Sequence, residues 1–173
     1  MDKKVFKDAK GRKVRTGHMK DNGVLEYVNN YFYRGDDKIP LGGLQTHYFD
    51  DGKVAIEREF LYSKHMKSLV FTKERIFDET GNMTEESFFD ERTGEKIKEK
   101  IFKRNKDGYL FAHRRTFEPD GSTIKTDDIC VALAGTLIPV DAPELKDFLS
   151  KLDNPFKKEI DPKARFLTQT KTR

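Results

Sequence analysis

The residues best able to do chemistry in this chain are its four histidines and its single cysteine. They are His18, His47, His65, His113 and Cys130. No two histidines have the spacing of metal ligands on one predicted element, and the sequence contains neither His-Glu-x-x-His nor Cys-x-x-Cys. Two aspartates follow shortly after His47, but they are better explained as turn residues. We therefore predict no metal site and no cofactor.

The strongest catalytic alternative is a pair of residues on one predicted strand. His113 and Arg115 alternate with aromatic residues along 109–117, so both belong to the same strand face. They could form a pocket in which His113 exchanges protons, or the face could be half buried with both side chains reaching water. Cys130 lies in the most apolar stretch and is predicted to be a buried structural thiol. We assign no catalytic residue, and an enzyme is the less favoured interpretation.

A second group of residues could bind single-stranded RNA or DNA. Eight Lys or Arg against two Asp give residues 1–20 a net charge of +6; residues 154–173 carry +4 and residues 21–153 carry −6. Cations neutralise phosphates, and exposed tyrosines can stack on unpaired bases, but the acidic middle of the chain argues against this function. The candidates are the basic N-terminal arm, Lys3, Lys4, Lys7, Lys10, Arg12, Lys13 and Arg15, and the tyrosines Tyr27, Tyr31 and Tyr33.

The elements that must position these residues are indicated by a recurring turn, in which an aromatic residue and one or more acids precede a glycine. It occurs at 49–52, 77–81, 89–94 and 117–121, and more loosely at 6–11. Glycine accepts the positive φ of tight hairpin turns, and Asp can bond the backbone beside it. Glycines at 11, 23, 35, 52, 81, 94, 108 and 121 are therefore predicted at strand ends, with 63–67 replacing a missing glycine turn.

The segments between the turns show the two-residue period of β-strands. Val54, Ile56 and Phe60 share one face of their segment, opposite Glu57 and Glu59, which are predicted to be solvated. In the segment after residue 94, lysines line one face, and isoleucines and glutamates share the other. This pattern indicates a strand that is largely exposed to water and lies near an edge of the sheet. The two consecutive glycines at 42–43 are predicted to form a bend between strands. We expect a mainly β fold, an antiparallel β-meander of about eight to ten strands, as an open or barrel-like sheet.

One C-terminal helix is predicted at about 142–153. Asp141 could cap it, Pro143 suits its first turn, and apolar residues follow at helical spacing. Residues 1–153 are predicted to form a single β domain that includes this helix. Residues 154–173 are predicted to be a basic tail, with Phe156 and Phe166 as anchors.

Two segments resemble a known repeat. The stretches 48–54 and 76–83 are similar to the variant MORN repeats of YwqK-type antitoxin-like proteins, which run as an aromatic pair, an acid or Asn, Gly, a polar residue and an aliphatic. Residues 89–95 and 117–123 follow the pattern more loosely, so the resemblance covers about 45–125. The second glycine of the family's unit is missing here. The resemblance implies stacked hairpins forming an elongated sheet used for binding, and it implies no catalytic residue.

Composition restricts the compartment and the class of function. Hydrophobic residues make up 35% of the chain and charged residues 37%, with a mean hydropathy of −0.80. The longest apolar run is far too short for a membrane span, no secretory leader is recognisable, and one cysteine cannot form an intrachain disulfide. We expect a cytoplasmic protein in a reducing compartment, without membrane association. The favoured function is non-catalytic: a protein-interaction or assembly module that binds a protein partner or itself.

Overall fold

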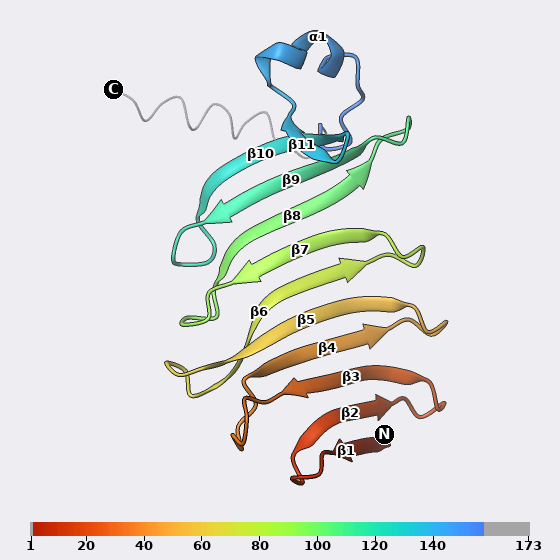
Figure 1. Ribbon diagram of the computed structural model, residues 1–173. Coiled ribbons are helices and arrows are strands. Elements are labelled where there is room, and N and C mark those ends of the chain that lie inside the picture. The colour runs from red at the N-terminus through yellow and green to blue at the C-terminus, as the bar shows by residue number, and fades with distance from the viewer. Residues whose placement is uncertain (1, 158–173) are drawn as a thin grey trace. The chain divides into compact units, whose positions relative to one another are not determined.

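Eleven antiparallel strands make up the computed structural model of this protein, which describes residues 2–157 (Figure 1). Each strand pairs with its neighbours in the sequence from β1 to β11, so the sheet is open. The predicted β-meander with one C-terminal helix is confirmed, with slightly more strands than the eight to ten expected. The strands are β1 (Lys3–Lys7), β2 (Lys13–Met19), β3 (Leu25–Phe32), β4 (Gly42–Tyr48), β5 (Val54–Ser63), β6 (Ser68–Phe77), β7 (Met83–Phe89), β8 (Lys96–Arg104), β9 (Leu110–Phe117), β10 (Ile124–Leu133) and β11 (Thr136–Pro139).

The predicted glycine turns are the points at which the chain reverses. All eight glycines predicted at strand ends have a positive φ, between 51° and 89°. In the turn that contains Gly81, Asp78 Oδ1 accepts the backbone N–H groups of Thr80 at 2.9 Å and Asn82 at 3.0 Å. The Thr80 hydroxyl and these N–H groups hold the pKa of Asp78 below its usual value. At the predicted turn without glycine, Lys67 takes the positive φ instead, at 51°.

The described chain divides into two compact units. The first contains residues 2–100 and 115–126, and the second contains residues 101–114 and 127–157. The second unit has a conventional hydrophobic core of Phe111, Val131, Leu149 and Phe156, each 7% exposed or less. Phe156, one of the two predicted anchors, is fully buried there, whereas Phe166 lies outside the described residues.

The C-terminal helix is shorter than predicted. Instead of about 142–153, it consists of a 3-10 turn, η1 (Pro143–Leu145), and one α-turn, α1 (Lys146–Leu149). Pro143 lies in its first turn as expected, but Asp141 does not cap it: the N-cap is Ala142, which has no side-chain hydrogen bond. A helix without caps gains little from its own backbone, so it extends only as far as packing holds it. Leu149 supplies that packing.

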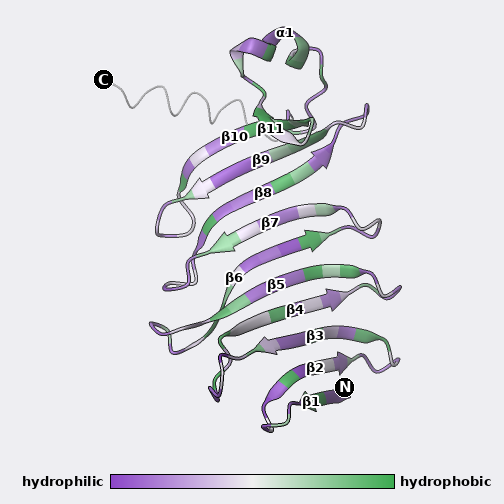
Figure 2. Cartoon of the chain, viewed as in Figure 1, coloured by the Kyte–Doolittle hydropathy of each residue, from purple (hydrophilic) through white to green (hydrophobic). Residues whose placement is uncertain are grey.

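The first unit is built of strands and their connections alone, so its sheet is covered by its own side chains. Figure 2 shows hydrophilic and hydrophobic segments interleaved along these strands. Even so, Val28 is only 2% exposed and Thr46 only 6%. Both lie on one face in cross-strand register, and longer side chains beside them exclude water. We call this side of the sheet the opposite face. Asn29 lies on the other side, which we call the ladder face because it carries the row of polar side chains described below.

Two local predictions need correction. The strand after residue 94, β8, is largely half-buried or exposed as predicted, but it lies between β7 and β9 and not at an edge, and its one buried residue is Glu99, which Lys96 and Arg115 neutralise at 2.8 Å and 2.5 Å. The predicted bend at 42–43 is instead the start of β4, where both glycines are buried. In each case a cross-strand neighbour decides the burial, which the alternation along one strand does not reveal.

Candidate functional site

A continuous ladder of polar side chains crosses five neighbouring strands on the ladder face. Asn29 Nδ2 donates to Thr16 Oγ1 at 3.1 Å, and Gln45 Nε2 donates to Asn29 Oδ1 at 2.9 Å. Arg58 donates to Gln45 Oε1 at 3.3 Å and to Glu74 Oε2 at 2.6 Å. These hydrogen bonds fix the register of β2 to β6 and make the ladder face a rigid platform. The aligned residues are Thr16, Asn29, Gln45, Arg58 and Glu74.

A stack of three rings lies on one side of the ladder. Tyr27 is between His18, at a centroid distance of 4.1 Å, and His47, at 5.1 Å. His47 Nε2 lies 3.0 Å from Gln45 Oε1, and burial, together with the positive charge of Arg58, lowers the pKa of His47. Both faces of the Tyr27 ring are therefore covered, so a nucleic-acid base would have to displace a histidine to stack on it.

An aromatic row lies on the other side of the ladder. Tyr31 pairs with Gly43, and Gly43 pairs with Phe60, which in turn faces Phe71 on β6. The ring of Phe60 meets Tyr31 edge-on at 5.8 Å and Phe71 at 6.4 Å. Gly43 has no side chain, so the ring of its neighbour Phe60 closes over its backbone. Phe60 is 6% exposed, whereas Phe71 is 44% exposed.

Beyond this row, the ends of four strands expose apolar side chains, which we call the apolar end. It consists of large residues that are 40% to 59% exposed, from the ends of β3 to β6 and the two connections between them. The Tyr62 N–H bonds to the Leu41 carbonyl at 2.9 Å, and Tyr62 pairs with Leu69, so these three form a further row. The exposed residues of the apolar end are Phe32, Ile39, Leu41, Leu61, Met66, Leu69 and Phe71.

None of these seven residues was among the predicted site residues, although the sequence contains a signal. Ile39, Leu41 and Met66 lie in connections between strands, where polar residues are usual, and nothing in the turn geometry requires them. Apolar residues in connections are exposed unless a second layer covers them. Phe32 and Leu61 both pair with Gly42 and lie on the opposite face, whereas Leu41, Leu69 and Phe71 share the ladder face. Single exposed apolar residues are ordinary, but a group that shares one face of a sheet is typical of an interface.

The predicted basic arm is folded into the first hairpin. Lys3, Lys4 and Lys7 lie on β1, the edge strand of the first unit, and all three are exposed. Lys13 and Arg15 lie on β2 and are also exposed. These five side chains are accessible to a ligand. The strand itself is held by its pairing with β2, so the arm is not a free segment.

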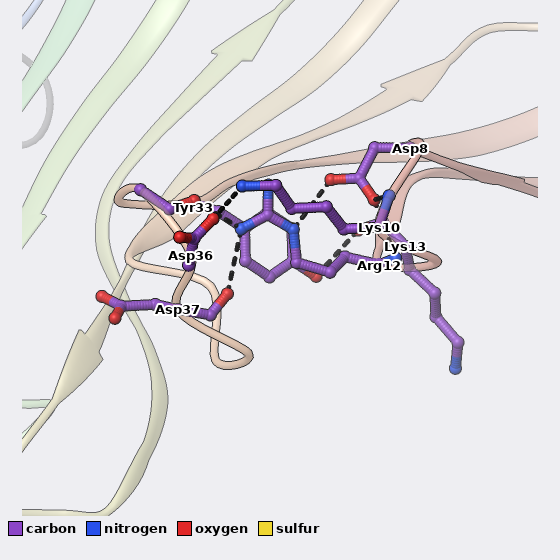
Figure 3. Close-up of polar contacts among 8 residues, drawn as sticks. Asp8, Lys10, Arg12, Lys13, Tyr33, Asp36 and Asp37 are labelled. Carbon is purple, nitrogen blue, oxygen red and sulfur yellow. Dashed lines mark hydrogen bonds and ion pairs between the residues drawn. The ribbon is translucent and has the colours of Figure 1, made fainter.

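Arg12, by contrast, has a structural role. Its Nε bonds to Asp8 Oδ2 at 2.7 Å, and its Nη1 donates to the carbonyls of Gly35 at 2.9 Å and Asp37 at 3.0 Å (Figure 3). The guanidinium also lies 4.4 Å from the ring centre of Tyr33. Arg12 therefore ties the β1–β2 turn to the β3–β4 connection with several charge-assisted bonds.

Two further contacts strengthen this attachment. Lys10 pairs with Asp36, and the Tyr33 hydroxyl donates to the Lys13 carbonyl at 2.9 Å (Figure 3). Of the predicted nucleic-acid residues, Lys10, Arg12 and Tyr33 are thus engaged within the protein. Tyr31 is engaged as well, through its contact with Phe60.

The two residues of the predicted pocket lie in different units. In the second unit, His113 bonds to Asp127 and meets the ring of Phe156 edge-on at 5.4 Å. In the first unit, Arg115 pairs with Glu99 at 2.5 Å, while its buried Nε has no partner among the described residues. His113 is thus engaged by a hydrogen bond and ring packing, and Arg115 by an ion pair.

The second unit has its own groove, of about 510 Å³. Neither His113 nor Arg115 lines it. Its floor is formed by core residues such as Phe111 and Leu149, so it is a shallow apolar depression beside α1. Its lining residues are Phe111, Val140, Asp141, Pro143, Lys146, Leu149, Ser150, Leu152, Asn154 and Lys157.

The remaining chemistry-bearing residues are placed as follows. Cys130 is fully buried, as predicted, and burial raises the pKa of its thiol to about 11, which suppresses the reactive thiolate. Between residues 2 and 157, no three His, Cys, Asp or Glu side chains are grouped closely enough to hold a metal ion. Over the same range, no helix is long and apolar enough to cross a membrane.

No family model matches this chain, and no curated protein matches it in sequence. The resemblance to variant MORN repeats therefore stays a prediction, and the function has to be argued from the surface of the protein itself.

Proposed function

We propose that this protein is a non-catalytic protein-interaction module, and that it binds its partner at the apolar end. The observation that carries the proposal is the exposure of Leu41, Leu69 and Phe71, which the strand register places together on the ladder face at one end of the sheet. Exposed apolar groups that cluster in this way gain free energy when a second surface covers them. The residues of the apolar end have no such cover within the first unit.

The platform beneath these residues favours binding without rearrangement. The rings of Phe71 and Phe60 meet edge-on. The guanidinium carbon of Arg58, in the polar ladder, lies 5.4 Å from the ring centre of Phe71. A ring held on two sides loses little conformational freedom when it is covered by a partner. Rigid aromatic anchors of this kind usually dominate the energy of an interface.

We expect the double variant Phe71→Ser, Leu69→Ser to lose partner binding. Protein retained on the wild-type chain from an extract of its native host would be identified, purified and titrated against each variant. Each buried apolar side chain contributes about 1.5–3 kcal/mol, so the affinity should fall by roughly a hundredfold. The matched control is Ile124→Ser, which removes an apolar side chain of the first unit that is 46% exposed but distant in sequence.

The two variants separate specific from general effects. Equal binding by the double variant and by wild type would refute the proposal. Equal loss with Ile124→Ser would also count against it, because the apolar end would then have no special role. Self-association is tested separately by sedimentation of the wild-type protein at low and high salt, where a strict monomer in both conditions excludes a second copy as the partner.

A second candidate function is the binding of single-stranded nucleic acid by β1. The specific observation in its favour is that Lys3, Lys4 and Lys7 are exposed and have no ion pair among the described residues. We expect the triple charge reversal Lys3→Glu, Lys4→Glu, Lys7→Glu to abolish any mobility shift of single-stranded DNA at low salt. Reversal of Arg12 is unsuitable as a test, because it would release the β3–β4 connection. An unchanged shift in the triple variant would remove this candidate.

A further inference from the structure

The apolar end is bordered by positive charge. The β3–β4 connection carries Arg34 and Lys38, and the β5–β6 turn carries Lys64 and Lys67. All four side chains are exposed, and none has an ion-pair partner among the described residues. The two connections that carry them lie beside each other at the apolar end, because the backbone bond from Tyr62 to Leu41 joins the end of the β3–β4 connection to the end of β5.

Acids on the same two connections do not cancel this charge. They are Asp36 and Asp37, and Asp36 is already paired with Lys10. Asp37 therefore offsets only one of the four cations, and the border has a net charge of +3. A ligand that covers the apolar end must lie against these cations, so an acidic ligand gains and a basic one is repelled.

The chemistry of the patch favours a protein ligand over a nucleic acid. Of its seven exposed residues only Phe32 and Phe71 are aromatic, and the other five are aliphatic or Met. Bases are held by stacking on aromatic faces, which aliphatic side chains do not offer. Leu41 and Leu69, which share the ladder face with Phe71, instead suit the apolar side chains of another protein.

We infer that the partner presents a segment with two or three large apolar side chains flanked on both sides by Asp or Glu. This inference rests on the proposed function and adds the charge of the partner to it. The apolar side chains cover Leu41, Leu69 and Phe71, while the acidic flanks lie against Lys38 and Lys64. The contact is therefore specific for charge as well as for apolar character, and it weakens as salt screens the flanks.

The test uses labelled synthetic peptides that differ only in their flanks. One has Leu-Phe-Leu at its centre and a Glu triplet on each side, its twin has Lys triplets, and a third has the Glu triplets around three Ser. Fluorescence anisotropy with the full chain should show the acidic apolar peptide binding at least about tenfold more tightly than its Lys twin at about 50 mM salt. The preference should shrink at about 300 mM salt, and the Ser peptide should bind no better than the Lys twin.

Charge reversal on the protein completes the test. The variant Lys38→Glu, Lys64→Glu, Lys67→Glu should reverse the preference toward the Lys peptide. The matched control Lys3→Glu, Lys4→Glu, Lys7→Glu has the same change in net charge on exposed residues of β1 and should keep the wild-type preference. Circular dichroism verifies that both variants fold, as expected for substitutions of exposed side chains.

The possible failures are distinguishable. Equal affinity for the acidic and basic peptides, both lost in the Phe71→Ser, Leu69→Ser variant, overturns the inference and leaves the proposed function standing. Peptide binding that is unchanged in the Phe71→Ser, Leu69→Ser variant contradicts both the inference and the proposed function. Tighter binding of single-stranded DNA than of the acidic peptide, lost on reversal of Lys38, Lys64 and Lys67, would also overturn the inference, since the cations would then recognise phosphate.

Discussion

The substitution Gly43→Ala should unfold or severely destabilise the first unit. An ideal β-carbon at this position would lie 2.0 Å from the carbonyl oxygen of Asn30 and 2.5 Å from the ring of Phe60. Neither neighbour can easily move: the carbonyl belongs to the adjacent strand, and Phe60 is held edge-on by Tyr31 and Phe71. Overpacking of this kind costs about 3 kcal/mol, which lowers Tm by about 10 °C. Thermal unfolding followed by circular dichroism measures the effect.

Gly17→Ala is the matched control for this prediction. Gly17 also lies within a strand and is buried, but a β-carbon there would meet only Leu25, at an ordinary contact distance of 3.8 Å. Its φ is not in the left-handed region, so alanine is accommodated and the lower entropy of the unfolded chain favours it slightly. Gly43→Ala also disturbs the row beneath Phe71, so partner binding should weaken with stability. Equal melting temperatures for the two variants would contradict the close approach of the Phe60 ring over Gly43.

The fold of this chain is readable from its sequence because each turn is encoded locally. A turn such as that of Asp78 and Gly81 needs only a few consecutive residues, and the hairpin it forms joins neighbours in the sequence. A meander is a series of such hairpins, so correct turns lead to the correct strand order. The helix was harder to predict, because its length depends on packing around Leu149 and not on a local cap.

The site was less predictable because burial in the first unit depends on register between strands. Ser87, for example, is a small polar residue but is only 5% exposed, because it is aligned with Glu74 at the end of the polar ladder. Irregularities near the ends of β2 and β4 and in the middle of β5 each shift the pairing by one residue. Such shifts decide which side chains become neighbours, and a single sequence does not locate them.

The basic arm illustrates the same difficulty. The sequence does not distinguish among the lysines and arginines of residues 3–15. In the structure, Arg12 bonds to Asp8 within its own turn and to backbone carbonyls more than twenty residues away in the sequence. Lys4, on the edge strand, is exposed and has no such partner within residues 2–157. The structure therefore separates a structural cation from accessible ones. Experiments on binding should use the accessible group, since reversal of Arg12 changes stability and charge together.

Glu86 should be the most sensitive charged residue of the opposite face, because three cations converge on it. Its carboxylate lies 3.3 Å from Lys73 Nζ, 3.3 Å from Arg75 Nε and 3.5 Å from Lys100 Nζ, and its side chain is only 11% exposed. Removal of its charge leaves the two lysines without their carboxylate, whereas Arg75 retains Glu57 and Glu59. We expect Glu86→Gln to lower the free energy of unfolding by about 2 kcal/mol at pH 7, since the cations keep partial contact with water.

The pH dependence identifies the cause. Burial alone would raise the pKa of Glu86, but hydrogen bonds from Arg75 and Lys73 and the charge of Lys100 outweigh it, so the pKa in the folded protein is lowered. Its contribution is therefore complete above the unfolded value near 4.5 and disappears as the pH falls through the lower folded value. Urea unfolding should show the largest deficit for Glu86→Gln at pH 7, and the deficit should shrink progressively as the pH is lowered below 4.5. The exposed neighbour Glu85, changed to Gln, should have little effect at either pH. A deficit for Glu86→Gln that persisted at low pH would instead indicate lost packing, and the ion cluster would then contribute little to the stability of the sheet.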